Sequence, residues 1–262
     1  MVVIKILRKC EVEDLRYISE VLDNYFSFTD DNKRKELLAK DGGDNAAREE
    51  LLHLIDKQIK YFGSSDVAYI ARSLTGSNGG VTTDEIIEDV CKKLNVKIKI
   101  GGSNEAKLER LVQAVVEKDL LSKKPEELAK AFEKIGIGNA DREQILKHIE
   151  MNGKVAILPL IYQYVGAKAA TGIIETIVIS IIAQFIGKEA AKHLVKEVIK
   201  RNPWLASLGP ALWTVSGAWL AFDLQGPAYR KTIPICLTLA LSRCAMAKNP
   251  PSLQIILLLP LI

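Results

Sequence analysis

The sequence lacks the short patterns that mark the common enzyme classes. It has no Walker loop, no G-x-G-x-x-G after a predicted strand, no H-E-x-x-H, no G-x-S-x-G and no spaced pair of C-x-x-C motifs. Only 3 histidines occur in 262 residues. We therefore expect no common nucleophilic, phosphate-binding or zinc-dependent chemistry, and we predict a protein that is not an enzyme and holds no cofactor or metal.

Cysteine and aromatic residues are also scarce. The four cysteines, Cys10, Cys91, Cys236 and Cys244, form no C-x-x-C pair, and the apolar run in MVVIKILRKC is too short for a secretory leader. This usage favours reduced thiols in the cytoplasm or at the cytoplasmic face of the inner membrane. With 48% hydrophobic and only 6% aromatic residues, the chain has the composition of a helical core of Leu, Ile, Val and Ala.

Charge is missing mainly from the second half. Residues 1–154 carry 26 Lys and Arg against 28 Asp and Glu, whereas residues 155–262 carry 10 against 4. The apolar half is therefore also the basic half. This combination suits an anionic membrane surface better than a nucleic acid, because the basic residues are sparse and are not interleaved with exposed aromatics.

The stretch from Trp204 to Phe222 carries no charge and contains all three tryptophans, Trp204, Trp213 and Trp219. Its nineteen residues either span a bilayer or form the buried centre of a helical fold. The preceding segment, 188–201, is an amphipathic helix by its spacing, with lysines repeating every four residues. Those lysines either rest on anionic lipid or face water. Membrane-contact candidates are thus the three tryptophans and Lys192, Lys196 and Lys200.

Two further groups of polar residues interrupt the apolar half. Asp223 and Arg230 flank the Gly226-Pro227 turn, and they either pair at a hairpin tip or in a polar cavity, or mark an exposed turn. Glu189, His193 and Glu197 share one helical face and could ligate a metal, but a solvated, salt-linked face is the favoured interpretation. Residues 155–187 lack a clean membrane span and are interpreted as a buried or interfacial hairpin that contains small residues such as Gly166.

The first half follows helical periodicity almost throughout. Asp44 is an expected N-cap, Thr82 with Glu85 forms a capping-box pattern, and Pro125 is an expected first helical residue. Residues 96–100 alternate strictly and suggest a short strand, and residues 1–10 suggest an edge strand or a poorly ordered leader. The expected helices cover residues 12–26, 30–40, 45–63, 64–74, 83–94, 105–121, 125–135 and 141–151.

The resulting prediction is a mainly α protein in three parts. Residues 1–152 form a helical interaction module, residues 153–247 an apolar helical hairpin region with glycines, and residues 248–262 an apolar tail. The composition change after Asn152-Gly153 sets the first boundary.

The segment 209–243, GPALWTVSGAWLAFDLQGPAYRKTIPICLTLALSR, resembles the C-terminal signature of the YaaW-like family of uncharacterised bacterial proteins. Its most specific pieces are GPAYR at 226–230 and TIP at 232–234. Segments 51–74 and 81–99 are similar to the family's helical region, which is related to the ubiquinol–cytochrome c chaperone domain. The resemblance implies a helical module that handles other polypeptides at an energy-coupling membrane, and it supplies no catalytic residues.

Together these patterns predict a membrane-associated helical protein that acts through protein or lipid binding, with membrane perturbation as one extension. The alternative is a soluble chaperone or assembly factor for a membrane-protein client, in which the apolar helices are buried in one globule. The expected partner is an anionic membrane surface or a protein client, not a nucleic acid. An oligomer is compatible with both.

Overall fold

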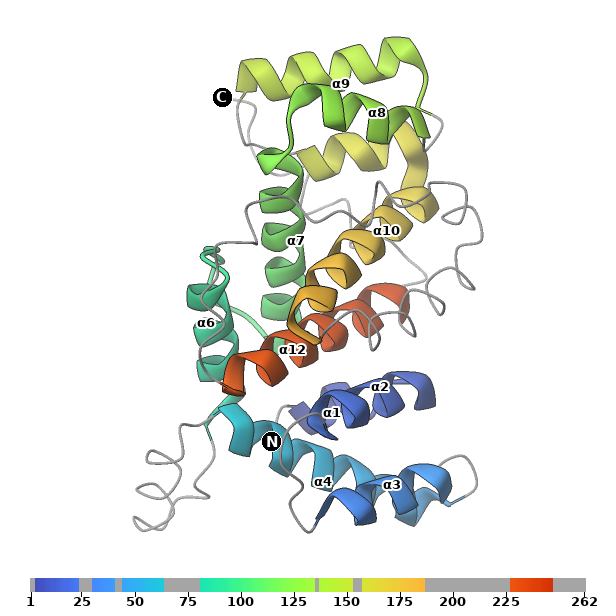
Figure 1. Cartoon of the computed structure of the whole chain (residues 1–262), viewed down its shortest axis with the longest axis vertical. Helices are drawn as coiled ribbons and strands as arrows, with labels where there is room; N and C mark the ends of the chain where they lie inside the picture. The colour runs from blue at the N-terminus through green and yellow to red at the C-terminus, as the bar shows by residue number, and fades with distance from the viewer. Residues whose placement is uncertain are drawn as a thin grey trace. The chain divides into compact units, whose positions relative to one another are not determined.

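A computed structural model describes residues 3–23, 30–40, 44–63, 81–134, 137–152, 157–186 and 227–246. Every regular element in these ranges is an α-helix, and none of the described residues lies in a strand. The predicted mainly α fold class is therefore confirmed (Figure 1). The helices are α1 (Val3–Leu7), α2 (Val12–Asp23), α3 (Asp30–Lys40), α4 (Asn45–Gly63), α6 (Thr83–Lys93), α7 (Asn104–Ser122), α8 (Pro125–Lys134), α9 (Asn139–Asn152), α10 (Ile157–Ile186) and α12 (Pro227–Met246).

The chain gathers into two compact units. One contains Met1–Leu111 and Asp223–Arg243, so that α12 belongs with the N-terminal helices despite its late place in the sequence. The other contains Val112–Phe222 and Cys244–Ile262. This grouping describes which segments pack together. The predicted division into an interaction module, a hairpin region and a tail, with boundaries at residues 152 and 247, is a statement about separate functional parts. It stays a prediction.

Caps in the sequence set several helix starts, as predicted. The Asp44 carboxylate accepts hydrogen bonds from the backbone N–H groups of Ala46 and Ala47, at 2.8 and 3.3 Å. Thr82 and Glu85 form the expected reciprocal capping box at the start of α6. Pro125 opens α8 with two glutamates in the first turn, where they oppose the positive end of the helix dipole.

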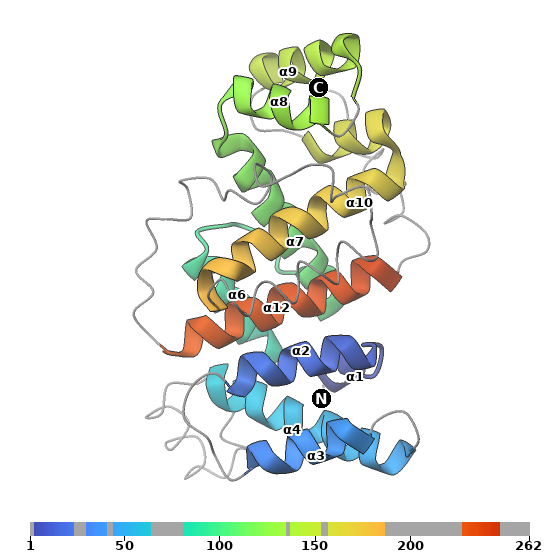
Figure 2. The ribbon, with the colours of Figure 1, turned by 45° about the vertical axis from the view of Figure 1, so that its right-hand side comes forward.

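The helices α1 to α4 and α6 lie in one compact unit and are here called the N-terminal bundle; each except α3 buries several aliphatic side chains. Helix α4 packs against α1, α2 and α3, and Figures 1 and 2 both show α3 and α4 side by side. Apolar residues three and four apart form the predicted stripes, because that spacing places them on one helical face. The buried ones include Leu15, Ile18, Val21, Leu22, Leu51, Leu52, Ile55, Ile59, Ile86, Ile87 and Val90.

The first ten residues differ from the expectation of a strand or a leader. Residues 3–7 form the short helix α1, and Val3, Ile4, Ile6 and Leu7 are buried. A five-residue helix of mostly β-branched residues has little stability of its own. Tertiary contacts with α4 stabilise it, including a hydrogen bond from the Arg48 guanidinium to the Cys10 carbonyl at 2.8 Å.

The expected strand at 96–100 is also wrong. The segment forms no strand with any of the described residues, and the Ile100 side chain is 60% exposed. Alternation alone cannot make a strand, because the backbone groups need a partner strand. Arg110 takes that place in part: its guanidinium donates hydrogen bonds to the Lys99 and Gly101 carbonyls.

The second unit contains α8, α9 and α10. Helix α9 packs on both of the others, and two polar contacts reinforce it: Arg142 pairs with Glu133 at 3.1 Å, and the Tyr164 hydroxyl donates to Gln144 at 2.6 Å. Helix α10 bends at Gly166, whose φ of 77° and ψ of 164° are not helical (Figure 1). None of the described helices combines the length and apolarity that crossing a membrane requires.

Candidate functional site

Most residues that the sequence singled out lie outside the described residues. These are the membrane-contact candidates Trp204, Trp213, Trp219, Lys192, Lys196 and Lys200, the turn residue Asp223, and the set Glu189, His193 and Glu197. Arg230 lies in the first turn of α12, but its side chain is not among those that the structure describes. Its pairing with Asp223 and the membrane contacts stay predictions.

Within the apolar half, the helix α12 supplies the candidate site. All ten residues from 231 to 240 are buried. Because successive residues of an α-helix point about 100° apart, ten of them cover every direction around the axis. This stretch of α12 is therefore enclosed on all sides.

Two faces of α12 contact different helices of the N-terminal bundle. Toward α6, the Lys93 ammonium lies 4.9 Å from the centre of the Tyr229 ring, and Cys236, seven residues later, lies near Cys91. Residues seven apart share a helical face, since seven residues make almost two turns.

Toward α2, α12 presents Lys231 and Thr238, which are also seven residues apart. Lys231 contacts Leu22, near the end of α2, and Thr238 lies beside Tyr17. The two helices therefore run in opposite directions. The Tyr17 and Thr238 hydroxyls are both buried, and neither makes a hydrogen bond of good geometry with the described residues. Burial raises the pKa of Tyr17, and the nearby Thr238 hydroxyl offsets part of that rise.

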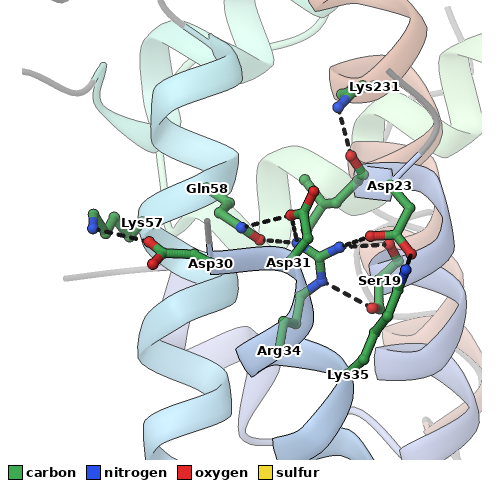
Figure 3. A network of polar contacts seen from close by, with 10 residues as sticks. Ser19, Asp23, Asp30, Asp31, Arg34, Lys35, Lys57, Gln58 and Lys231 are labelled. Carbon is green, nitrogen blue, oxygen red and sulfur yellow. Dashed lines mark hydrogen bonds and ion pairs between the residues drawn. The ribbon is translucent and has the colours of Figure 1, made fainter. Parts of the chain in front are cut away.

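The Lys231 side chain is the most unusual feature of this contact. It is 2% exposed, its ammonium donates to the Leu22 carbonyl at 2.5 Å, and it lies 3.6 Å from the centre of the Phe62 ring of α4. Leu22 and Lys231 are 209 residues apart in the sequence. Figure 3 shows this lysine approaching from α12 toward a polar cluster between α2, α3 and α4.

Arg34 of α3 is the centre of that cluster, and its side chain is fully buried. Its guanidinium donates to the Ser19 hydroxyl at 2.9 Å and to the Asp31 carboxylate at 2.8 Å. It also donates to Gln58 and Asp23, so that α2, α3 and α4 all supply oxygen acceptors (Figure 3). A guanidinium has five N–H donors and cannot lose its charge in a protein, so burial at this position requires such a set of acceptors.

The cluster determines the electrostatics of Lys231. Burial lowers the pKa of Lys231 to about 8, because an ammonium group loses its hydration there. The Asp31 and Asp23 carboxylates oppose that shift, and the Arg34 guanidinium adds to it. A lysine with this pKa holds an appreciable neutral fraction near neutral pH, unlike an exposed lysine.

The buried thiols are poor nucleophiles. Cys10, Cys91 and Cys236 are all buried thiols. Burial raises the pKa of Cys91 to about 11 and that of Cys236 to about 12, so both stay protonated at neutral pH. In the part of the chain that the structure describes, no three His, Cys, Asp or Glu side chains come together in a way that would hold a metal.

Sequence reasoning missed Arg34, Asp31 and Lys231 as a site. Arg34 lies in DDNKRKELLAK, where a charged residue usually belongs to a solvated helix face. The available signal was at Lys231, which with Arg230 directly precedes an uncharged run from 232 to 242. A basic pair at the start of an apolar run is a common flank of membrane-seeking helices.

The chain is similar to UPF0174 proteins of Helicobacter pylori. One from strain J99 is 26% identical over 246 residues, which cover 92% of this chain and 90% of that relative. Another, from strain 26695, is 23% identical over 189 residues, covering 72% of this chain and 86% of the relative. No family model and no solved structure matches the chain. The chain thus has homologues among bacterial UPF0174 proteins along most of its length.

Proposed function

We propose that the protein is a non-enzymatic binding factor that takes up an apolar helix of a membrane-protein client where α12 now lies. One observation carries this proposal: ten consecutive residues of α12 are buried, and α2, α4 and α6 of the N-terminal bundle all contact this helix. A bundle that packs against one buried apolar helix has the chemistry to pack against another of similar pattern.

The helix α12 is the template for the client. It has a basic start, a run of uncharged residues from 232 to 242 and two small hydroxyl side chains, Thr232 and Thr238, within the buried stretch. This pattern is that of a short apolar membrane segment with a basic flank. The client class that fits is therefore a nascent or unassembled helix of an inner-membrane protein.

The resemblance to the YaaW-like family and to the ubiquinol–cytochrome c chaperone domain agrees with this proposal. A chaperone or assembly factor needs an apolar binding surface and no catalytic group. The buried Arg34 fits that role, since it pairs with the Asp23 and Asp31 carboxylates.

Photo-crosslinking in living bacteria tests the proposal. A photoreactive phenylalanine analogue replaces Phe62 in the full-length protein, and a matched control carries it at Lys92, a residue of α6 that is 74% exposed. We expect the Phe62 position, and not the control, to form adducts with apolar helices of inner-membrane proteins. Adducts confined to the protein's own α12 would contradict the proposal.

Membrane association is a second proposal, and it depends on the sequence of residues 188–222, which lie outside the described residues. The uncharged stretch from Trp204 to Phe222 and the lysines of 188–201 are the observations that favour it. The protein would then work on or in the cytoplasmic face of the inner membrane, as a monomer or an oligomer, and lipid binding would extend to membrane perturbation. Carbonate extraction of membranes separates the cases, because an inserted protein stays in the pellet. Dye release from anionic vesicles measures perturbation.

A further inference from the structure

The Lys231 ammonium lies at the C-terminal end of α2, beside the Leu22 carbonyl. Leu22 is the last residue but one of α2, so its carbonyl is among the four that no N–H group of the same helix reaches. The C-terminal end of a helix also carries a partial negative charge. The Lys231 ammonium, at 2.5 Å from this carbonyl, occupies a place that favours a donor.

The Phe62 ring and two carboxylates add to the negative potential at this point. The Phe62 ring of α4 presents its face at 3.6 Å from ring centre to Lys231 Nζ, well inside the range of about 6 Å for cation–π attraction. The carboxylates of Asp23 and Asp31 also act on the Lys231 amine. Groups from α2, α3 and α4 thus converge on one amine.

The charges of the cluster are complementary to that amine. Among the groups that influence Lys231, Asp23 and Asp31 are negative and Arg34 is positive, which leaves one negative charge for an incoming amine to neutralise. Lys35 also pairs with Asp23, at 2.8 Å, but its side chain is 56% exposed and largely solvated. All receiving groups belong to the N-terminal bundle, whereas α12 supplies only the amine.

We propose that the Leu22 carbonyl, the Phe62 ring and the Asp23 and Asp31 carboxylates form an amine subsite, which binds a lysine that leads an apolar helix. Lys231 fills the amine subsite in cis and competes with the client. This inference depends on the proposed function, because it names the chemistry of the client helix. It also makes α12 a built-in competitor.

The amine subsite should distinguish lysine from arginine. A lysine ammonium is a compact group that one carbonyl and one ring face can hold, whereas a guanidinium is a planar fork of five N–H donors that needs more acceptors. The charged groups around it are Asp23 of α2 and Asp31 and Arg34 of α3, with Lys35 on Asp23, while α4 presents the Phe62 ring. Because burial lowers the pKa of this lysine from 10.5 to about 8, a lysine-led helix should bind more tightly as the pH rises between these two values.

Peptide binding to the full-length protein tests this proposal. The probes are fluorescein-labelled peptides of residues 227–243 with Lys, Arg or Met at position 231, followed by fluorescence anisotropy. The receptors are the wild-type chain, Lys231→Glu, which places a carboxylate against Asp23 and Asp31, and Lys92→Glu as a matched control on an exposed part of α6.

We expect Lys231→Glu to bind the lysine peptide about tenfold more tightly than the wild type and Lys92→Glu do, because the competing helix is displaced. The lysine peptide should also bind Lys231→Glu about tenfold more tightly than the Arg and Met peptides do. Those two peptides carry no amine at position 231, so the Leu22 carbonyl and the carboxylates of the subsite lack that partner. Equal affinity for the three peptides would overturn the amine subsite alone. Equal affinity of the wild type and Lys231→Glu would overturn the competition in cis.

No binding of any peptide to a folded Lys231→Glu chain would contradict the proposed function itself. Circular dichroism and a thermal melt establish whether the variant folds. Lys231→Met, which is neutral and similar in length, is the second receptor if Lys231→Glu does not fold. The same order of the three peptides is expected for it, and an equal affinity for all three would overturn the amine subsite there as well.

Discussion

At the scale of single residues, Arg34 and its acceptors depend on one another. Asp31 is almost fully buried and receives hydrogen bonds from Arg34 at 2.8 Å and from Gln58 at 3.1 Å. If the guanidinium is removed, the Asp31 carboxylate remains in a low-dielectric place without its main counter-charge. The cost then comes from the group left behind, more than from the lost contact.

We predict that Arg34→Met lowers the free energy of unfolding by about 3–5 kcal/mol. The matched control is Lys35→Met on the same helix, whose side chain is 56% exposed and should cost less than about 1 kcal/mol. Denaturant unfolding followed by circular dichroism measures both. Equal, small losses for the two variants would mean that the cluster does not stabilise the bundle.

Lys231 predicts a dependence of stability on pH. Its pKa is 10.5 in the unfolded chain and about 8 when buried, so the unfolded state binds more protons between these values. The stability of the wild type relative to Lys231→Met should therefore rise with pH through this window, by at most about 3 kcal/mol, and be lost again as the pH falls through 8. Urea unfolding of both proteins across the window measures the difference, and parallel pH profiles would refute it.

At the scale of elements, the local sequence accounts for most helix boundaries. The predicted 30–40 helix matches α3 at both ends, and Asp44, Thr82 and Pro125 start helices as expected, because caps act within one turn of the chain. The errors at residues 1–10 and 96–100 concern short segments with β-branched residues. Each of them packs or hydrogen-bonds with groups that are not part of a strand, so no sheet forms.

The bend of α10 gives a prediction at this scale. Gly166 has a φ of 77° with a ψ of 164°, a conformation that side chains other than glycine rarely adopt. Because no atom of the described residues lies within 4 Å of the place that an alanine methyl group would take, Gly166→Ala tests backbone strain alone. We expect it to lower the free energy of unfolding by about 1–3 kcal/mol.

Gly101→Ala is the matched control, since that position is equally open and has no positive φ. Its effect should stay within about 0.5 kcal/mol. Thermal melts of the two variants compare them, and a loss at Gly101 as large as that at Gly166 would rule out strain at the bend as the cause.

At the scale of the whole molecule, the structure describes some segments of the apolar half and leaves others outside the described residues. The described segment 231–240 of α12 is enclosed, so its apolar surface needs no membrane. The stretch from Trp204 to Phe222 and the lysines before it lie outside the described residues, and their membrane contact is a separate proposal.

We predict that exchanging Lys192, Lys196 and Lys200 together for glutamine weakens binding to anionic vesicles by about 1 kcal/mol per lysine. Matched exchanges at Lys35, Lys57 and Lys92, all more than half exposed on the N-terminal bundle, should leave binding unchanged. Vesicle co-sedimentation at low and high salt measures both sets. Equal losses for the two sets would indicate only a general charge effect.

The sequence by itself determined the helical fold class, the capped helix starts and the contrast between a charged and an apolar half, because each depends on neighbours a few residues apart. The tertiary structure decided that α12 joins the N-terminal bundle, and that Lys231 meets the end of α2 beside the Arg34 cluster. These contacts join residues up to 209 positions apart. No local pattern encodes such pairings, since the packing of buried faces selects them only when the whole bundle assembles.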